Sequence, residues 1–142
     1  MGRIIIVSNR LPITIHQNGT GFSYRPSAGG LATGLNSMDR SLERVWVGWP
    51  GEEITLPAIQ EQVLDDLIQD GLVPVFLSKK EIELYYEGFS NKTIWPHFHY
   101  FTQYTTYQDD YWEAYSLVNQ KFADAIKPIL QADDLVWVHD YQ

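Results

Sequence analysis

The residues of this sequence that are best suited to chemistry come directly after its first apolar run. Residues 3–7 (RIIIV) are followed by Asn9 and Arg10 and, after a polar stretch, by Gly29 and Gly30. If a helix begins at these glycines, its free backbone N–H groups and the positive end of its dipole lie near the Arg10 guanidinium. This combination suits an anion, above all a phosphate. The alternative is an ordinary first strand followed by a capped helix.

Two further residues of this kind follow later apolar runs. Trp49 ends the run at residues 44–49, and Asp140 follows the run at residues 135–138. An aspartate can accept hydrogen bonds from sugar hydroxyls or take a proton, and a tryptophan can stack on the apolar face of a sugar ring. Two alternatives stay open: a structural ion pair between Arg10 and Asp140, and a Trp49 side chain packed inside its own loop.

These residues come together only if the runs are parallel strands of one sheet. The β-branched run at residues 3–7 predicts a central strand covered by helices on both faces. Parallel sheets bind ligands at the carboxyl ends of their strands, and in the strand order 3-2-1-4 the first and fourth strands are neighbours. Arg10 and Asp140 are then expected to face each other at that edge.

The rest of the sequence predicts an α/β fold, a Rossmann-like three-layer parallel sheet with an inserted β-hairpin. Asn18 and Gly19 predict the hairpin turn between strands at 13–16 and 22–24. Pro74 places the third strand, at 72–77, at an edge of the sheet. Helices are predicted over 31–42, 56–69, 78–89 and 109–130, and the aromatic stretch at 91–100 is expected to form a binding loop or a small aromatic core.

Two of these helices carry further expectations. Ser78 and Glu81 predict a capping box at the start of the helix over 78–89. Asp109 and Asp110 are expected to interact with the dipole of the long helix rather than to act as catalytic acids. Apolar spacing along this helix predicts one buried face, made of Trp112, Tyr115, Val118, Phe122, Ala125, Ile126 and Ile129.

The amino-acid composition disfavours several classes of binding partner. The 142 residues carry ten basic and eighteen acidic side chains, a net charge of −8, which disfavours nucleic acid and anionic membranes. We find no apolar run long enough for a membrane span and no signal peptide, and we therefore expect a cytoplasmic location. Without cysteine, His97 and His99 make only a weak metal motif, so neither a metal nor a cofactor is expected.

The phosphate-binding motifs of other families do not occur. No Lys-Ser or Lys-Thr follows the glycines, which excludes a Walker loop, and no G-x-G-x-x-G is present, which disfavours a nicotinamide site. Because no helix is predicted after the fourth strand, we expect an N-terminal fragment or an incomplete domain.

Six segments together resemble the amino-terminal part of the α,α-trehalose-phosphate synthase family, the UDP-forming retaining glycosyltransferases. They are VSNRLP at 7–12, SAGGL at 27–31, WVGWPG at 46–51, YYxxFSN at 85–91, IWP at 94–96 with FHY at 98–100, and WVHDYQ at 137–142. One such motif alone would be weak evidence, but six in the family's order along the whole chain are specific.

The resemblance implies the N-terminal half of a GT-B fold, in which two Rossmann-like domains enclose the active site. Residues 1–142 would form an incomplete N-terminal, acceptor-side domain, with the C-terminal nucleotide-sugar domain absent. The implied reaction moves glucose from UDP-glucose to glucose 6-phosphate and gives trehalose 6-phosphate and UDP. Retention in this family is usually explained by front-side attack, in which the leaving phosphate deprotonates the acceptor.

The resemblance also implies roles for particular residues. Arg10 would hold the acceptor phosphate. Trp49, Tyr86 and Trp95 would wall the acceptor glucose pocket, with Tyr86 and Trp95 also near the phosphate. Asp140 would bind acceptor hydroxyls and is the implied catalytic residue.

On the donor side, Gly29 and Gly30 would let backbone amides approach the diphosphate of UDP-glucose. The family's basic donor-binding residues lie in the second domain, so these 142 residues alone are expected to be inactive. Two alternatives stay open: a non-catalytic sugar-phosphate-binding or regulatory module of the same family, and a related glucosyltransferase with another acceptor such as glycerol phosphate. The sequence leaves open whether the chain forms a homo-oligomer.

Overall fold

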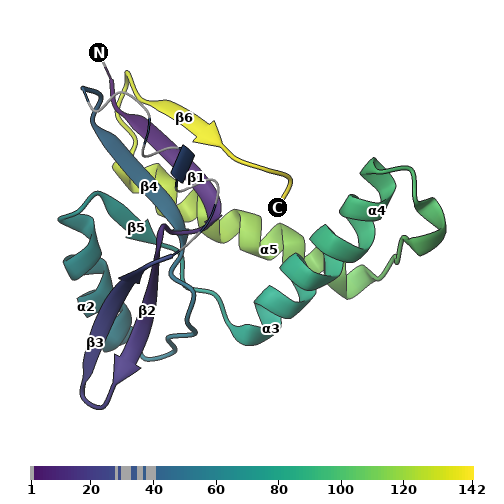
Figure 1. Ribbon diagram of the computed structural model, residues 1–142, viewed down its shortest axis with the longest axis horizontal. Coiled ribbons are helices and arrows are strands. Elements are labelled where there is room, and N and C mark those ends of the chain that lie inside the picture. The colour runs from purple at the N-terminus through teal and green to yellow at the C-terminus, as the bar shows by residue number, and fades with distance from the viewer. Residues whose placement is uncertain (1, 28, 30–32, 35–36, 38–40) are drawn as a thin grey trace.

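The computed structural model describes residues 2–27, 29, 33–34, 37 and 41–142 (Figure 1). Gly30 and most of the helix predicted over residues 31–42 lie outside the described residues. Among the described helices, none is both long and apolar enough to cross a membrane.

The centre of the fold is a parallel sheet of four strands. These are β1 (Ile4–Arg10), β4 (Arg44–Trp49), β5 (Leu72–Pro74) and β6 (Leu135–Val138). Their order across the sheet is β5-β4-β1-β6, which confirms the predicted order 3-2-1-4. β5 lies at one edge, as Pro74 predicts, because proline has no N–H to donate to a further strand. β1 and β6 are neighbours, and their carboxyl ends meet at one edge of the sheet.

The central position of β1 follows from its four consecutive apolar residues, which are buried on both faces of the sheet. Ile5 and Val7 pack with Val118 of α5 (Asp109–Ile126) on one face. Ile4 and Ile6 pack on the other face with Val63 of α2 (Pro57–Ile68). The two hydrophobic clusters on either side of the sheet confirm the three-layer α/β architecture.

The predicted hairpin is also confirmed. β2 (Ile13–Asn18) and β3 (Gly21–Pro26) pair antiparallel around a turn in which Gly19 has a φ of 60°. Ile15 of this hairpin is fully buried in the same cluster as Ile4 and Ile6. The hairpin therefore extends the α2 side of the core beside the end of β1.

The aromatic stretch after Ser78 is more helical than predicted. α3 (Lys79–Glu81) continues into the π-helical segment η1 (Ile82–Ile94) and then into α4 (Trp95–Phe98). The capping box of Ser78 and Glu81 is confirmed. The predicted helix end near residue 89 and the loop at 91–100 were wrong, because Pro96 falls in the first turn of α4, where a proline is tolerated.

The long helix ends earlier than predicted, and its predicted buried face is confirmed except at Trp112: Val118 is in the core, and Tyr115, Phe122, Ala125, Ile126 and Ile129 pack against it. α5 stops at Ile126 and is followed by the 3₁₀ turn η3 (Lys127–Ile129). Tyr111, Ala114 and Val118 are its buried residues, whereas Trp112 is 55% exposed. Apolar side chains occupy more than one stripe of this helix, and Trp112 packs sideways on Phe89 of η1, at 5.5 Å between ring centroids. Asp109 and Asp110 lie in the first turn, where their charges suit the helix dipole.

An ion pair ties the start of β1 to the turn before β6. The Arg3 guanidinium donates to both carboxylate oxygens of Asp134, at 2.7 and 3.2 Å, and also to the Ile129 carbonyl at 2.6 Å. The hydrogen bond from Arg3 lowers the pKa of the Asp134 carboxyl from an ordinary 3.8 to about 2. The two strands that carry Arg10 and Asp140 are thus tied together at the opposite end of the sheet.

The Arg3–Asp134 pair predicts a specific loss of stability in acid. The folded carboxyl has a lower pKa than the unfolded one, so its stabilisation is present above about pH 4 and is lost as the pH falls towards about 2. We expect the melting temperature of the wild type to fall more steeply over this range than that of Asp134→Asn, which melts lower at neutral pH. Asp133→Asn is the control, because it removes a neighbouring charge and keeps the pair. Parallel curves for the wild type and Asp134→Asn would contradict this prediction.

Candidate functional site

The site begins where β1 leaves the sheet. The pairing of β1 with β4 shifts register between Val7 and Arg10. In this irregular segment the Ser8 hydroxyl donates to the Arg10 carbonyl at 2.7 Å, and Trp46 Nε1 donates to the Ser8 hydroxyl, also at 2.7 Å. Ser8 and Trp46 are both buried. This chain of hydrogen bonds fixes the backbone that presents Asn9 and Arg10 beyond the sheet edge.

Two glycines of β4 and its turn make room for that segment. A Cβ on Gly48 would lie 2.8 Å from the Arg10 carbonyl carbon and from the Leu11 nitrogen. Gly51, with a φ of +86°, would place a Cβ 2.5 Å from the Arg10 guanidinium. The sequence WVGWPG therefore positions Arg10, because glycine alone allows this close approach.

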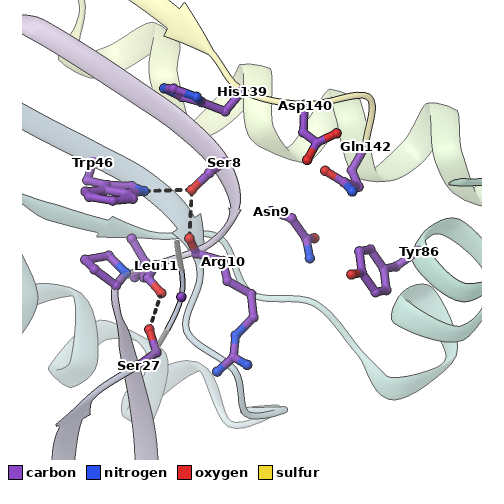
Figure 2. Close-up of a pocket in the computed structure, with 12 residues that line it drawn as sticks. Ser8, Asn9, Arg10, Leu11, Ser27, Trp46, Tyr86, His139, Asp140 and Gln142 are labelled. Carbon is purple, nitrogen blue, oxygen red and sulfur yellow. Dashed lines mark hydrogen bonds between the residues drawn. The ribbon is translucent and has the colours of Figure 1, made fainter. Parts of the chain in front are cut away.

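A cavity of about 270 Å³ opens beside this segment. Figure 2 shows side chains converging on it from the end of β1, from η1 and from the residues after β6. Its lining residues are Ser8, Asn9, Arg10, Leu11, Pro12, Ser27, Gly29, Trp46, Tyr86, His139, Asp140 and Gln142. Segments from the two ends of the chain therefore share one surface, at the edge of the sheet where parallel strands bind ligands.

Three of the predicted side chains line the cavity: Arg10, Tyr86 and Asp140. Gly29 also lines it, while Gly30 lies outside the described residues. The cavity thus combines a cation, an aromatic ring and a carboxylate.

The other two predicted aromatic residues lie beyond the lining. Trp49 packs against the core, and the Arg10 guanidinium carbon lies 5.7 Å from the centroid of its ring. Trp95, on α4, is 48% exposed and contacts the Tyr141 ring at 5.5 Å between centroids. Trp49 therefore lies next to Arg10, and Trp95 contacts the residue that follows Asp140.

Arg10 and Asp140 do not form the ion pair that the sequence left open. Arg10 Nη2 donates to the Thr14 hydroxyl at 2.5 Å, and Asp140 Oδ1 accepts the Tyr141 N–H at 2.9 Å. No ion pair joins the two side chains in the described part of the chain. Both are exposed, so a guanidinium for an anion and a carboxylate for hydroxyl groups remain available to a ligand.

The backbone at Asp140 explains how its carboxylate comes to lie there. Its φ of 67° is in the left-handed region, which aspartate tolerates better than most residues. The hydrogen bond from the Tyr141 N–H supports this conformation. The His139 N–H donates to the Val7 carbonyl at 2.8 Å and pairs the chain with β1 up to the residue before Asp140.

Sequence reasoning did not assign a role to several residues that line the cavity, among them Asn9, His139 and Gln142. Position points to both Asn9 and His139, because Asn9 lies near the end of β1 and His139 directly follows β6. Their side chains alone give no such signal, since asparagine and histidine are common in turns.

Metal ligands are sparse. Among residues 2–27, 29, 33–34, 37 and 41–142, no group of three or more His, Asp or Glu side chains could hold a metal ion. His99 Nδ1 lies 2.8 Å from the Trp95 carbonyl, and its ring is 3.9 Å from that of Trp95. His99 therefore has a local structural partner within α4 and the turn that follows.

The chain is similar to known proteins along almost its whole length. Residues 2–142 match the model of glycosyltransferase family 20. The bifunctional trehalose-6-phosphate synthase/phosphatase of Thermoproteus tenax is 46% identical to this chain, with 98% of the chain and 20% of that protein covered.

Two solved structures are similar over 99% of the chain and 28% of their own length. One is an α,α-trehalose-phosphate synthase (UDP-forming) from Burkholderia vietnamiensis, with a TM-score of 0.72 and 32% identity. The other is the enzyme of this name from Burkholderia xenovorans in complex with glucose-6-phosphate, with a TM-score of 0.69 and 32% identity. The chain thus spans less than a third of the length of the proteins it resembles.

The close approach at Gly48 predicts a stability defect. We expect Gly48→Ala to lower the free energy of unfolding by about 1–3 kcal/mol, because the added methyl group meets backbone atoms that cannot move aside. Urea unfolding followed by tryptophan fluorescence measures this change. Gly21→Ala is the control, since its Cβ would meet only the Asn18 carbonyl oxygen, at 3.9 Å. Equal stability of the two variants would show that the end of β1 is not held tightly against β4.

Proposed function

Because the chain belongs to glycosyltransferase family 20, we propose that it forms the acceptor-binding side of a trehalose-6-phosphate synthase. Such an enzyme transfers glucose from UDP-glucose to glucose 6-phosphate and gives trehalose 6-phosphate and UDP. The observation that carries this proposal is the convergence of Arg10, Tyr86 and Asp140 on one cavity, although they come from three separate parts of the chain.

Each of these groups suits one part of glucose 6-phosphate. The Arg10 guanidinium binds the phosphate, because it can donate two hydrogen bonds and carries a full positive charge. The Asp140 carboxylate accepts hydrogen bonds from sugar hydroxyls. Tyr86 presents an aromatic ring to the apolar face of the pyranose. The similar synthase from Burkholderia xenovorans was solved with glucose-6-phosphate, which supports this choice of acceptor.

Three further assignments complete the proposed binding surface. The Trp49 ring packs against the Arg10 guanidinium and so helps to position the group that binds the phosphate. Trp95 forms the outer wall beyond Tyr141. Gly29, with Gly30, provides backbone N–H groups for the donor diphosphate. In the described part of the chain, no atom lies within 4 Å of the position that a Cβ would take at Gly29, which leaves space for that approach.

The chemical step asks this part of the enzyme to orient the acceptor. The anomeric hydroxyl oxygen of glucose 6-phosphate forms a bond to the anomeric carbon of the donor glucose on the face that the leaving group occupies. The bond between that carbon and the UDP oxygen breaks, and the acceptor proton passes to the leaving phosphate. Asp140 serves catalysis by fixing the acceptor hydroxyls, and Arg10 by fixing its phosphate, so that the attack is intramolecular in effect.

The length of the related proteins supports a division of the proposed enzyme into two domains. The chain covers 20% of the Thermoproteus relative and 28% of each similar structure. We assign residues 1–142 to an incomplete N-terminal, acceptor-side domain, and the groups that bind the uridine of UDP-glucose to a C-terminal domain. A cytoplasmic location stays a prediction from the sequence, which leaves the oligomeric state open.

Loss of the Arg10 guanidinium tests the phosphate assignment. We expect Arg10→Ala to weaken glucose 6-phosphate binding to the 142-residue chain by about 10- to 100-fold, the range for a lost charged hydrogen bond. Isothermal titration calorimetry measures the dissociation constant, with Lys80→Ala as a control that removes an equal, exposed charge on α3. Lower stability of Arg10→Ala with unchanged affinity would instead identify Arg10 as structural. Stronger competition by glycerol 3-phosphate than by glucose 6-phosphate would favour the other acceptor class.

Turnover is a separate expectation. We expect no transfer of glucose from UDP-glucose by the 142 residues alone, because the proposed uridine-binding groups lie outside them. A coupled assay for UDP release in the presence of both substrates measures this. UDP release that depends on glucose 6-phosphate and exceeds the background without protein would contradict the assignment of donor binding to another domain.

A further inference from the structure

Asn9 is the one residue between Ser8 and Arg10, and its role is separate from theirs. Its side-chain oxygen, Oδ1, accepts a hydrogen bond from the Tyr85 hydroxyl. Asn9 also lines the cavity that contains Arg10 and Asp140. One end of the carboxamide is therefore held by the protein, while the side chain as a whole borders the ligand cavity.

Tyr85 is a fixed and permanently protonated partner. It lies in η1, is 1% exposed and packs in the same cluster as Val7 and Val118. Burial raises the pKa of its hydroxyl above the usual value, so the group keeps its proton at any physiological pH. The Ser90 hydroxyl donates to the Tyr85 carbonyl at 2.8 Å and secures the turn that carries this ring. The Tyr85 hydroxyl is thus available as a donor, and Asn9 Oδ1 is the acceptor it uses.

This bond determines what Asn9 offers to a ligand. An asparagine side chain has one oxygen that accepts and one nitrogen, Nδ2, that donates two hydrogens. With Oδ1 bound to Tyr85, Nδ2 has no hydrogen-bond partner within the described part of the chain. Figure 2 shows the Asn9 carboxamide between Arg10 and Tyr86, on the side of the cavity where Asp140 lies.

We infer that Asn9 is a further acceptor-binding residue, which donates through Nδ2 to a hydroxyl of the sugar ring, and that Tyr85 is the positioning residue that orients it. This inference rests on the proposed function, since it assigns Asn9 to the same acceptor. The Arg10 side chain extends away from Asn9, towards Thr14 of the hairpin, so the phosphate end and the sugar end of the pocket are distinct.

Asn9 and Asp140 together give the site its preference for a sugar, because one side chain donates hydrogen bonds and the other accepts them. A hydroxyl group both donates and accepts hydrogen bonds. Asp140 accepts from the sugar hydroxyls and Asn9 donates to them, so together they satisfy groups that a simple phosphate lacks. A site built in this way discriminates against ligands without those hydroxyls, because its own polar groups are then left without partners.

The experiment compares two ligands that share a phosphate. Glucose 6-phosphate and inorganic phosphate are titrated into the 142-residue chain and its variants, and phosphorus NMR follows the binding of both. We expect Asn9→Ala to weaken glucose 6-phosphate binding by about 3- to 10-fold, the range for one neutral hydrogen bond, and to leave phosphate binding unchanged. Tyr85→Phe is expected to weaken the sugar phosphate in the same selective way, by a smaller factor, because Nδ2 is present but no longer oriented. Arg10→Ala is expected to weaken both ligands.

Asn9→Asp separates binding from folding. It keeps an oxygen for the Tyr85 hydroxyl, so the melting temperature is expected to stay near that of the wild type, and it removes the donor. Its added charge weakens both ligands alike, whereas the lost donor affects only the sugar. We therefore expect the loss in affinity to be larger for glucose 6-phosphate than for phosphate. This variant carries the test if Asn9→Ala does not fold.

The outcomes distinguish the inference from the proposed function. If the wild type binds glucose 6-phosphate, Arg10→Ala weakens both ligands and the Asn9 variants affect both equally or neither, then Asn9 only tethers η1 to β1 and the inference is wrong. If the wild type does not bind glucose 6-phosphate, the proposed function fails and the inference fails with it.

Discussion

The candidate site depends on how the end of β1 is held against β4. Ser8, whose hydroxyl accepts from Trp46 and donates to the Arg10 carbonyl, occupies the irregular part of the strand pairing. Gly48 allows the two backbones to approach closely at this point. A buried series of hydrogen bonds of this kind is rigid, because breaking one of them leaves a donor and an acceptor without partners and away from water. Successive residues beyond it can then point in different directions and serve different parts of one ligand.

The features that sequence predicted well are those set by strand and turn patterns. The apolar run of β1 indicated a central strand, Pro74 an edge strand, and Asn18-Gly19 a hairpin, and the structure has each of them. These patterns act locally and need no knowledge of side-chain contacts. The placement of Arg10 and Asp140 on one edge followed from them, because strand order alone decides which carboxyl ends are neighbours.

Other features depend on tertiary contacts that sequence does not display. The aromatic residues around Trp95 suggested a loop, yet they continue a helix whose preceding segment, η1, packs on α5. The buried face of α5 was misplaced at Trp112, because several apolar stripes compete on that helix and only the shape of its neighbours decides between them. The bond between Asn9 and Tyr85 joins residues 76 positions apart and could not be found from spacing.

The position of Asp140 depends on contacts that β6 and its flanking residues make with β1. β6 pairs with β1 and is exposed along its length. Its register is fixed by backbone pairing up to the bond from His139 to Val7, and by the ion pair of Arg3 with Asp134 at the other end. Each of these contacts is made by β1 or by the residue just before it. Arg10, Asn9 and Asp140 are therefore all positioned by β1. A shift of β1 moves the three side chains together and preserves their spacing. A change in the β1–β6 pairing alters that spacing, because it moves Asp140 alone.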